Sequence, residues 1–295
     1  MNARAQIFFM VDLEQLEALD MQLWLRSGVA ASLYCLCNES SVIRRSRAAL
    51  KIFGLTLNKG IEFHLIGNIE LINFQREVHQ KARFHGYRPL RLEATHYIKQ
   101  YLSKPPVQGW HLGSCDHRGC EALLLLLSER IIDAYVTSDL EDLPTNPEFT
   151  VIPLWTWPGE LVVHPFHPLA KSRNISRGDL DRFPSLIIPE NLYPKLSQLI
   201  YFNGFGNNRI LPRYDIGSWE EITDDALTIS YGSCLSIAVN SNLARLNWQH
   251  DITGGEALVL MNDCLEQPAI ALLLDDLKGR AMRLQSFFPQ LKVQL

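Results

Sequence analysis

The stretch that decides the fold is residues 27–54, SGVAASLYCLCNESSVIRRSRAALKIFG. It predicts two short helices joined by a tight turn. Ser27 and Asn38 precede the two helices and can cap them, because their side-chain oxygens accept the unpaired N–H groups of a first turn. Gly54 suits the left-handed residue that ends a helix. In the first helix we expect three apolar side chains to face inward: Val29, Ala30 and Leu33.

The second predicted helix has two different faces. At 100° per residue, small and apolar side chains collect on one of them: Val42, Ser46, Ala49, Leu50 and Phe53. The opposite face is basic and polar. This is the arrangement of a helix-turn-helix, whose second helix lies in the major groove of DNA. A solvated helix of an ordinary bundle would show the same pattern. The side chains expected to contact DNA are Ser40, Ser41, Arg44, Arg45, Arg47, Lys51 and, further along the chain, Lys59.

The flanking segments extend this unit. Asp12 and Gln15 resemble a capping box that opens a helix with leucines on one face: Leu13, Leu16, Leu19 and Leu23. Residues 55–65 alternate and turn at residues 58–60, which predicts a small β-wing. Residues 68–84 return to helical spacing, with apolar positions that include Ile69, Ile72, Val78 and Ala82. A second copy of the chain is the simplest cover for this stripe, so we expect a homodimer or homotetramer.

Composition places the chain among ordinary globular proteins. Its 295 residues are 47% hydrophobic and 20% charged, and its net charge is −4. Residues 1–88 hold 11 Lys+Arg against 8 Asp+Glu (+3), whereas residues 89–295 hold 17 against 24 (−7). A basic N-terminal part and an acidic C-terminal part fit a DNA-binding module joined to another domain. The apolar runs 7–11 and 123–127 are too short for a signal peptide or a membrane span, so we expect a cytoplasmic protein with free cysteines and no membrane partner.

Residues 85–89, HGYRP, break the helical pattern and mark a domain boundary. Beyond them strands alternate with helices, which predicts a parallel sheet covered by helices. Strands are expected at 90–94, 109–114, 132–137, 151–155, 160–164, 185–188, 210–214, 226–231 and 257–261. Helices are expected at 95–102, 118–130, 194–205, 233–245 and from residue 268 onward. Two such α/β lobes joined by two crossings form a cleft for a small ligand.

The order of these parts resembles the LysR-type transcriptional regulators. One block that carries the match is residues 27–54, where the family has small residues in the second helix and a Ser/Thr/Arg-rich recognition helix that ends in Gly. The other is residues 160–190, with HPLA at 167–170, ISRGDL at 175–180 and FPSLII at 183–188. The resemblance covers nearly the whole chain.

The resemblance implies an α/β protein with an N-terminal all-α winged helix-turn-helix. The expected divisions are a DNA-binding domain at 1–66, a linker helix at 67–86 and a two-lobed, periplasmic-binding-protein-like effector domain at 87–295. Lobe I would comprise about 89–164 and 263–295, and lobe II about 165–262. The function implied is that of a bacterial regulator, which binds double-stranded operator DNA and responds to a small effector in its cleft.

Three residues depart from the family pattern. Glu39 and Ile43 stand where the recognition helix usually carries Gln and Ser or Thr, and the wing has Lys59 where an Arg is usual. An acidic residue repels phosphate, and Ile43 cannot donate a hydrogen bond. The alternative is therefore a small-molecule-binding protein with a degenerate DNA-binding module.

The expected effector contacts are polar residues at the points where strands lead into helices, because hydroxyls and free N–H groups gather there. Thr95 falls where the family commonly has an effector-contacting Ser or Thr. Any one of these residues could instead be a helix cap or a turn residue. Together they imply a polar small molecule, with anions among the candidates. The set is Thr95, His96, Ser114, Thr137 and Ser138 in lobe I, with Asn191, Tyr231 and Ser233 in lobe II.

Other chemistry finds little support in the sequence. His111, Cys115, His117 and Cys120 do not follow a common zinc spacing. Cys35 and Cys37 are two apart on a predicted helix and point to different sides. We find no nucleophile elbow, no phosphate-binding loop and no HExxH motif. We therefore expect neither an enzyme nor a bound metal or cofactor.

Overall fold

The structure is a computed structural model that describes residues 11–60, 62–116, 118–138, 140–186, 190, 194–202, 208–209, 225–232, 234, 242–248 and 252–295. The chain divides into two compact units. Unit 1 comprises Met1–Leu92, Gly109–Gly113 and Leu125–Asp133, and unit 2 comprises the remainder. The domain boundaries expected near residues 66 and 86 stay a prediction.

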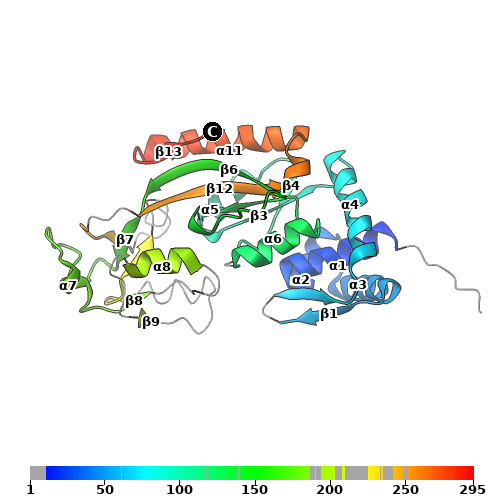
Figure 1. Cartoon of the computed structure of the whole chain (residues 1–295), viewed down its shortest axis with the longest axis horizontal. Coiled ribbons are helices and arrows are strands. Elements are labelled where there is room, and N and C mark those ends of the chain that lie inside the picture. Colours follow the sequence, from blue (N-terminus) through cyan, green and yellow to red (C-terminus); the bar gives the residue numbers. More distant parts are fainter. Residues whose placement is uncertain are drawn as a thin grey trace, which may run out of the picture. The chain divides into compact units, whose positions relative to one another are not determined.

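Unit 1 begins with three helices, α1 (Leu13–Leu25), α2 (Gly28–Tyr34) and α3 (Glu39–Phe53), which pack together in Figure 1. The predicted N-caps are confirmed. Gln15 N donates to Asp12 Oδ1 at 2.7 Å, Ala30 N to Ser27 Oγ at 3.2 Å, and Ser41 N to Asn38 Oδ1 at 2.8 Å. Gly54 ends α3 with φ +65°, the left-handed conformation that glycine adopts without strain. The helix-turn-helix predicted from residues 27–54 is therefore present.

The inward faces of α1 and α2 differ in part from the prediction. Val29 and Leu33 are 59% and 72% exposed, and Ala31 is the buried residue of α2 instead. The reason is that a helix of seven residues buries only one narrow strip, and in α2, which contacts both α1 and α3, that strip is at Ala31. Leu13, at the open end of α1, is also exposed, whereas Leu16, Leu19 and Leu23 are buried as expected.

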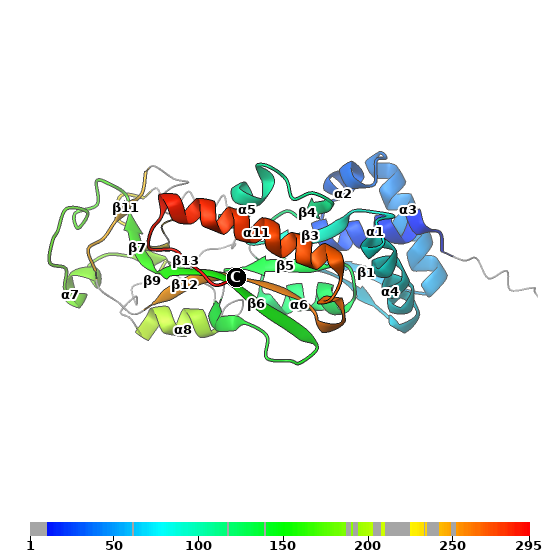
Figure 2. The same cartoon turned by 90° about the horizontal axis from the view of Figure 1, so that it is seen from above.

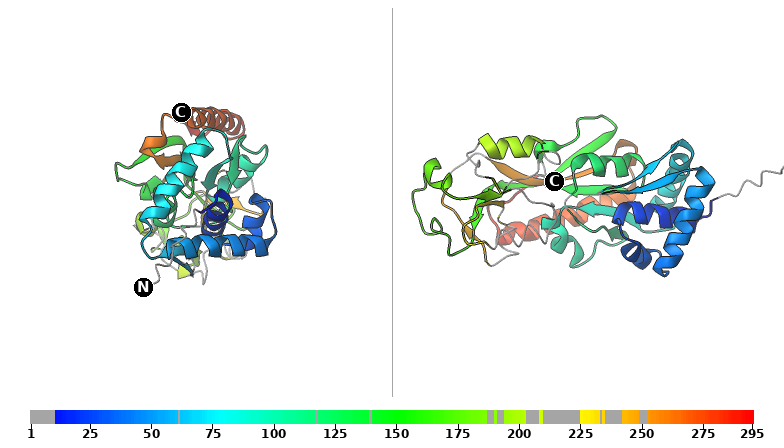
Figure 3. Two further views of the ribbon diagram at one scale, coloured as in Figure 1. Left: turned by 90° about the vertical axis from the view of Figure 1, so that its right-hand side faces the viewer. Right: turned by 90° about the horizontal axis from the view of Figure 1, so that it is seen from below.

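The wing consists of β1 (Thr56–Lys59) and β2 (Phe63–Ile66), which pair antiparallel. Their closing pair is Lys59 with Phe63, so the turn lies between these residues and begins later than predicted. The linker helix α4 (Glu70–Phe84) follows, and the end-on view in Figure 3 shows it in cyan beside the blue helices α1 to α3.

Helix α4 packs against its own unit largely through charged side chains. Arg76 is fully buried and donates Nε to Asp20 Oδ1 of α1 at 2.9 Å. Its Nη1 donates to Asn73 Oδ1 at 2.9 Å and to Glu129 Oε2 at 2.6 Å. The linker helix is thus tied both to α1 and to the C-terminal end of α6 (Cys120–Ser128).

A second buried group lies two turns further along α4. Arg83 pairs with Asp133 through two hydrogen bonds of 2.8 Å, and Gln80 Nε2 donates to the same carboxylate at 3.0 Å. Asp133 also accepts the Arg91 backbone N–H at 2.8 Å. Burial by itself would lower the pKa of Arg83, but the charge and hydrogen bonds of Asp133 outweigh it and raise that pKa. Burial, with the neighbouring Arg83 charge, lowers the pKa of Arg91. These side chains fix α4 through directional contacts as well as through the buried Ile72.

The larger sheet has six strands in the order β13-β6-β12-β5-β3-β4. Its members are β3 (Leu90–Ala94), β4 (Trp110–Leu112), β5 (Ala134–Thr137), β6 (Phe149–Pro158), β12 (Thr253–Met261) and β13 (Lys292–Val293). Strands β3 and β4 are parallel, as predicted. The sheet as a whole is mixed, because the long strands β6 and β12, which lie outside the predicted βαβαβ unit, pair antiparallel with each other, and β12 also pairs antiparallel with β5.

Helices cover this sheet. In Figure 2, α11 (Pro268–Phe287) runs along one face of it. The helix begins at Pro268 as predicted and buries Ile270, Leu273 and Leu277. Arg280 of α11 donates to the carbonyl oxygens of Tyr101 and Pro105, which holds the end of α5 (His96–Ser103).

A smaller sheet carries the second part of unit 2. Its order is β10-β7-β11, with strands β7 (Glu160–Val163), β10 (Ser230–Gly232) and β11 (Ala244–Arg245). A short pair, β8 (Ser185–Leu186) with β9 (Asn208–Arg209), lies near helices α7 (Arg177–Leu180) and α8 (Pro194–Phe202) in the chain. The 3₁₀ turns are η1 (Leu140–Asp142) and η2 (Asn262–Cys264). The prediction of a helix at 233–245 is wrong for its last residues, which form β11. The strand expected at 210–214 lies outside the described residues.

The HPLA, ISRGDL and FPSLII segments have structural roles. His167 Nδ1 accepts the Leu169 N–H at 3.1 Å, and its ring lies 4.4 Å from that of Phe183. Ser176 and Asp179 form a reciprocal capping box at the start of α7. This second block of the sequence therefore builds the core beneath β7, which includes Leu161, Val163, Leu180, Leu196 and Ile200.

Candidate nucleic-acid interface and effector site

The outer face of α3 is basic. Arg44, Arg47 and Lys51 are exposed, and in the described part of the chain no ion pair engages them. The opposite face of the same helix buries Val42, Ser46 and Ala49. The helix is thus anchored on one side and presents three cations on the other, which is the arrangement that phosphate and base contacts require.

The other predicted DNA contacts are placed differently. Arg45 forms an ion pair with Glu14 of α1 and so lies toward the body of the unit. Ser40 Oγ donates to Asn38 Oδ1 at 2.8 Å, within the cap of α3, where Ser41 supplies the capped N–H. Lys59 Nζ lies 5.7 Å from the centre of the Phe63 ring in the wing. The DNA-contacting roles of all these residues stay predictions.

Glu39, the acidic residue at the start of α3, has a specific place. A Cβ atom added to Gly28 would come within 2.7 Å of Glu39 Oε1 and 2.9 Å of its Cγ. The Glu39 carboxylate therefore rests against the first residue of α2, where the partial positive charge of a helix N-terminus stabilises an anion.

A cavity of about 400 Å³ lies beside α2 in unit 1, lined by Glu14, Glu17, Leu33, Tyr34, Cys35, Leu36, Arg45, Arg88, Pro89 and His111. The Tyr34 hydroxyl donates to the Leu112 carbonyl, and its ring lies 4.4 Å from that of His111. Burial raises the pKa of the Cys35 thiol to about 12, and the nearby Glu17 and Cys37 contribute to the same shift. Burial lowers the pKa of His111, and the nearby Arg91 charge contributes to the same shift.

The His/Cys cluster noted in the sequence is spread out. His111 lies against Tyr34, whereas Cys120 Sγ is 3.4 Å from the Tyr135 hydroxyl. Cys115 is buried, and burial together with Glu93 raises the pKa of its thiol. His117 lies outside the described residues. Within the described ranges, no three His, Cys, Asp or Glu side chains come together as a metal site would require.

Two predicted effector residues meet. Thr95 Oγ1 lies 2.5 Å from Ser138 Oγ, and Ser138 Oγ is 2.9 and 3.0 Å from the two carboxylate oxygens of Glu256. Glu256 is fully buried on β12 and was not singled out from the sequence, since it lies 118 residues from Ser138. Thr95 and Ser138 are half-buried, so neither hydroxyl residue is fully enclosed.

The described residues among the other predicted effector contacts are placed as follows. Thr137 is buried in β5, and His96 is the first residue of α5. Ser114 Oγ is buried without a hydrogen-bond partner among the described residues, while its carbonyl accepts Lys99 Nζ at 2.9 Å. Tyr231 packs beside Gly159, where an added Cβ would meet its hydroxyl at 2.7 Å. Asn191 and Ser233 lie outside the described residues.

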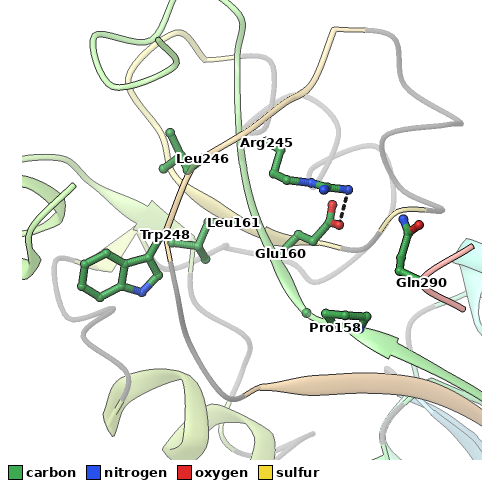
Figure 4. Close-up of a pocket in the computed structure, with 8 residues that line it drawn as sticks. Pro158, Glu160, Leu161, Arg245, Leu246, Trp248 and Gln290 are labelled. Carbon is green, nitrogen blue, oxygen red and sulfur yellow. Dashed lines mark ion pairs between the residues drawn. The ribbon is translucent and has the colours of Figure 1, made fainter. Parts of the chain in front are cut away.

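A second cavity, of about 240 Å³, lies at β7 and β11 in unit 2 (Figure 4). Arg245 makes an ion pair with Glu160 across it, with Trp248, Pro158 and Gln290 around them. Burial raises the pKa of the Glu160 carboxyl, and the Arg245 charge opposes that shift. The sequence offers no signal for this cavity, because its lining comes from segments that are far apart in the chain.

No protein-family model and no curated protein sequence matches this chain. Solved structures do share its fold. A full-length OxyR variant from Pseudomonas aeruginosa has a TM-score of 0.56 at 14% identity, and the match covers 92% of this chain and 95% of that protein. ArgP from Mycobacterium tuberculosis has a TM-score of 0.53 at 16% identity, with 92% and 97% covered.

CbnR, described as a LysR family transcriptional regulator, is a further match. Its full-length structure in complex with target DNA has a TM-score of 0.54 at 12% identity, and the match covers 91% of this chain and 99% of that protein. The described part of the chain contains no helix with the length and apolarity needed to cross a membrane. The chain has the fold of a full-length LysR-family transcriptional regulator.

Proposed function

We propose that this protein is a LysR-type transcriptional regulator that binds double-stranded operator DNA and responds to a small effector. The observation that carries the proposal is the exposed basic face of α3, with Arg44, Arg47 and Lys51 directed away from the buried face of the same helix. The two confirmed caps, at Asn38 and Gly54, hold this helix at its full length. A fixed helix with one cationic face suits the major groove.

The side chains divide into two roles. Arg44 and Arg47 lie near the middle of α3 and can reach base edges, where Arg donates two hydrogen bonds to guanine. Lys51, one turn further on, suits a phosphate contact, which strengthens binding to all sequences alike. Arg45 contributes through its ion pair with Glu14, which holds α3 against α1.

The protein acts as a dimer or a higher oligomer in this proposal. Leu71, Phe74 and Val78 are spaced at three and four residues along α4 and are 70%, 60% and 64% exposed. They form one apolar stripe on the side that the buried Arg76 and Arg83 leave free, in place of the stripe expected at Ile69, Ile72, Val78 and Ala82, because Ile72 is buried within unit 1. A second copy of α4 would cover this stripe and would place two recognition helices on one operator.

The experiment that tests the proposal is a footprint of the full-length protein on the DNA just upstream of its own gene. We expect protection of a specific site. Arg44→Ala should weaken operator binding by about 1–3 kcal/mol and relax the preference at one base position. Arg45→Ala is the matched control, a neighbouring arginine whose charge is used inside the protein, and it should leave the base preference unchanged.

The alternative is a small-molecule-binding protein whose DNA-binding module has degenerated. Ile43 favours it, because this half-buried apolar side chain beside Arg44 can offer DNA only apolar contact. Glu39 argues less strongly for it than the sequence suggests, since its carboxylate rests against Gly28. Failure to bind any intergenic DNA at low salt, by a correctly folded protein, would favour this alternative over the regulator.

A further inference from the structure

Thr95, Ser138 and Glu256 form a hydrogen-bonded chain that leads from a buried carboxylate to a partly exposed hydroxyl. The Ser138 hydroxyl donates toward Glu256, whose two oxygens lie 2.9 and 3.0 Å away. Thr95 Oγ1 lies 2.5 Å on the other side of Ser138 Oγ. Glu256 is 0% exposed, so solvent does not compete for these contacts at the inner end.

The backbone explains why these three side chains meet. Strand β12 pairs antiparallel with β5, with Ala257 opposite Thr137, and one further step in this register sets Glu256 opposite Ser138. On its other side β12 pairs with β6, and the register there shifts between Glu256 and Ala257, next to Pro153. Proline lacks the N–H that a regular ladder needs, so this irregularity has a local cause.

Thr95 turns its side chain toward Ser138 and away from its own helix. It occupies the N-cap position of α5, yet its side chain makes no capping hydrogen bond. Its hydroxyl is therefore committed to Ser138 rather than to the first turn of α5.

The direction of donation along this chain follows from counting protons. Each hydroxyl carries one proton and two lone pairs. When Glu256 is ionised, Ser138 gives its proton to the carboxylate, so the Ser138 oxygen can only accept from Thr95. Thr95 in turn gives its proton to Ser138. What Thr95 presents to an incoming molecule is lone pairs and no proton.

We propose that Glu256 sets the hydrogen-bond polarity of the effector site, so that the effector presents an N–H donor, an amine or an amide, to Thr95. This inference rests on the proposed effector site at Thr95 and Ser138. A carboxylate or phosphate would bring its own lone pairs against those of Thr95 and would gain no hydrogen bond there. The anionic effector that the hydroxyls alone suggest is thereby disfavoured at this point.

The test compares two probes of equal length, n-butylammonium and n-butyrate, titrated into the full-length protein and followed by ligand-observed NMR. We expect the amine to bind the unaltered protein about tenfold more tightly or better, since only the amine can donate a hydrogen bond to Thr95 and its positive charge, unlike the negative charge of butyrate, is attracted by Glu256. In Glu256→Gln the new amide can donate to Ser138 and let both hydroxyls reverse, so the preference should fall by about tenfold. Glu266→Gln, an exposed position with the same change of charge, is the control and should keep the preference.

A second pair of variants tests the outer end of the chain. Thr95→Ser keeps the hydroxyl and should keep amine binding, whereas Thr95→Val should weaken it about tenfold. If circular dichroism shows that Glu256→Gln does not fold, the Thr95 pair and the probe preference decide alone.

Four outcomes would overturn the inference: tighter binding of butyrate by the unaltered protein, an unchanged preference in folded Glu256→Gln, equal amine binding by the two Thr95 variants, or no binding of either probe. The operator footprint, measured without any probe, is independent of all four. A missing footprint with intact amine preference would reject the regulator and leave the polarity of the site standing.

Discussion

Arg76 provides the most direct test of how the linker helix is held. Its guanidinium is fully buried and bridges Asp20 of α1 and Glu129 at the end of α6. Replacing it with methionine keeps much of the side-chain volume but leaves two buried carboxylates without this cation. Removing one partner of a buried charge pair costs about 3–5 kcal/mol, because the remaining charge is both desolvated and unpaired. We therefore expect Arg76→Met to lower the free energy of unfolding of unit 1 by about that amount.

The assay is urea unfolding of the full-length protein, followed by a probe that reports on unit 1, where Trp24 is fully buried in α1. Lys81→Met, on the same helix, is the matched control. The ion pair of Lys81 with Glu77 is exposed, since the Lys81 side chain is 69% exposed to solvent. Loss of this pair should change the free energy of unfolding by less than about 1 kcal/mol. If Arg76→Met proved no more destabilising than Lys81→Met, the buried network would not be what secures α4. Adding Asp20→Asn and Glu129→Gln to Arg76→Met should recover most of the loss.

Four further outcomes are expected. Lys51→Ala should weaken binding to all DNA sequences alike and reduce the slope of affinity against salt by about one, as measured by titration at several salt concentrations. Phe74→Glu should shift the full-length protein to smaller species in sedimentation, because it puts a charge in the apolar stripe of α4. Cys35 should react with iodoacetamide at pH 8 far more slowly in the folded protein than in urea, because its pKa of about 12 leaves about one thiol in ten thousand ionised. Burial raises the pKa of Glu129 above its ordinary 4.5, so the folded state binds this proton more tightly than the unfolded state does. The free energy of unfolding should therefore fall as the pH rises from about 4.5. Glu129→Gln should flatten that part of the profile of urea midpoint against pH.

Local signals in the sequence predicted local structure well. The caps at Asp12, Ser27 and Asn38 depend on side chains three residues from the N–H groups they accept, and all three are confirmed. The helical stretch 68–84 and the strand 90–94 likewise follow from short-range periodicity. The inward face of α2 was predicted wrongly, because a seven-residue helix is too short for its pattern to show which strip meets the neighbours.

Contacts between distant segments could not be predicted from one sequence. By its position in the sequence, Arg45 belongs to the basic helix. Its ion pair is with Glu14, which lies 31 residues away and could not be identified from the sequence. Thr95 and Ser138 were candidates because they follow strands, but Glu256 had no motif of its own. Its role depends on strand register, which is a property of the folded sheet.

The buried charges on α4 also bear on how the chain can be divided or recombined. Unit 1 is discontinuous in sequence, since it takes in Gly109–Gly113 and Leu125–Asp133 as well as the N-terminal segment. A fragment truncated after Arg88 would retain Arg76 and Arg83 but lose their acceptors on Glu129 and Asp133. A chimera that joins the N-terminal segment of unit 1 to another regulator would also have to carry Glu129 and Asp133. The N-terminal segment and Leu125–Asp133 are therefore expected to be exchanged together.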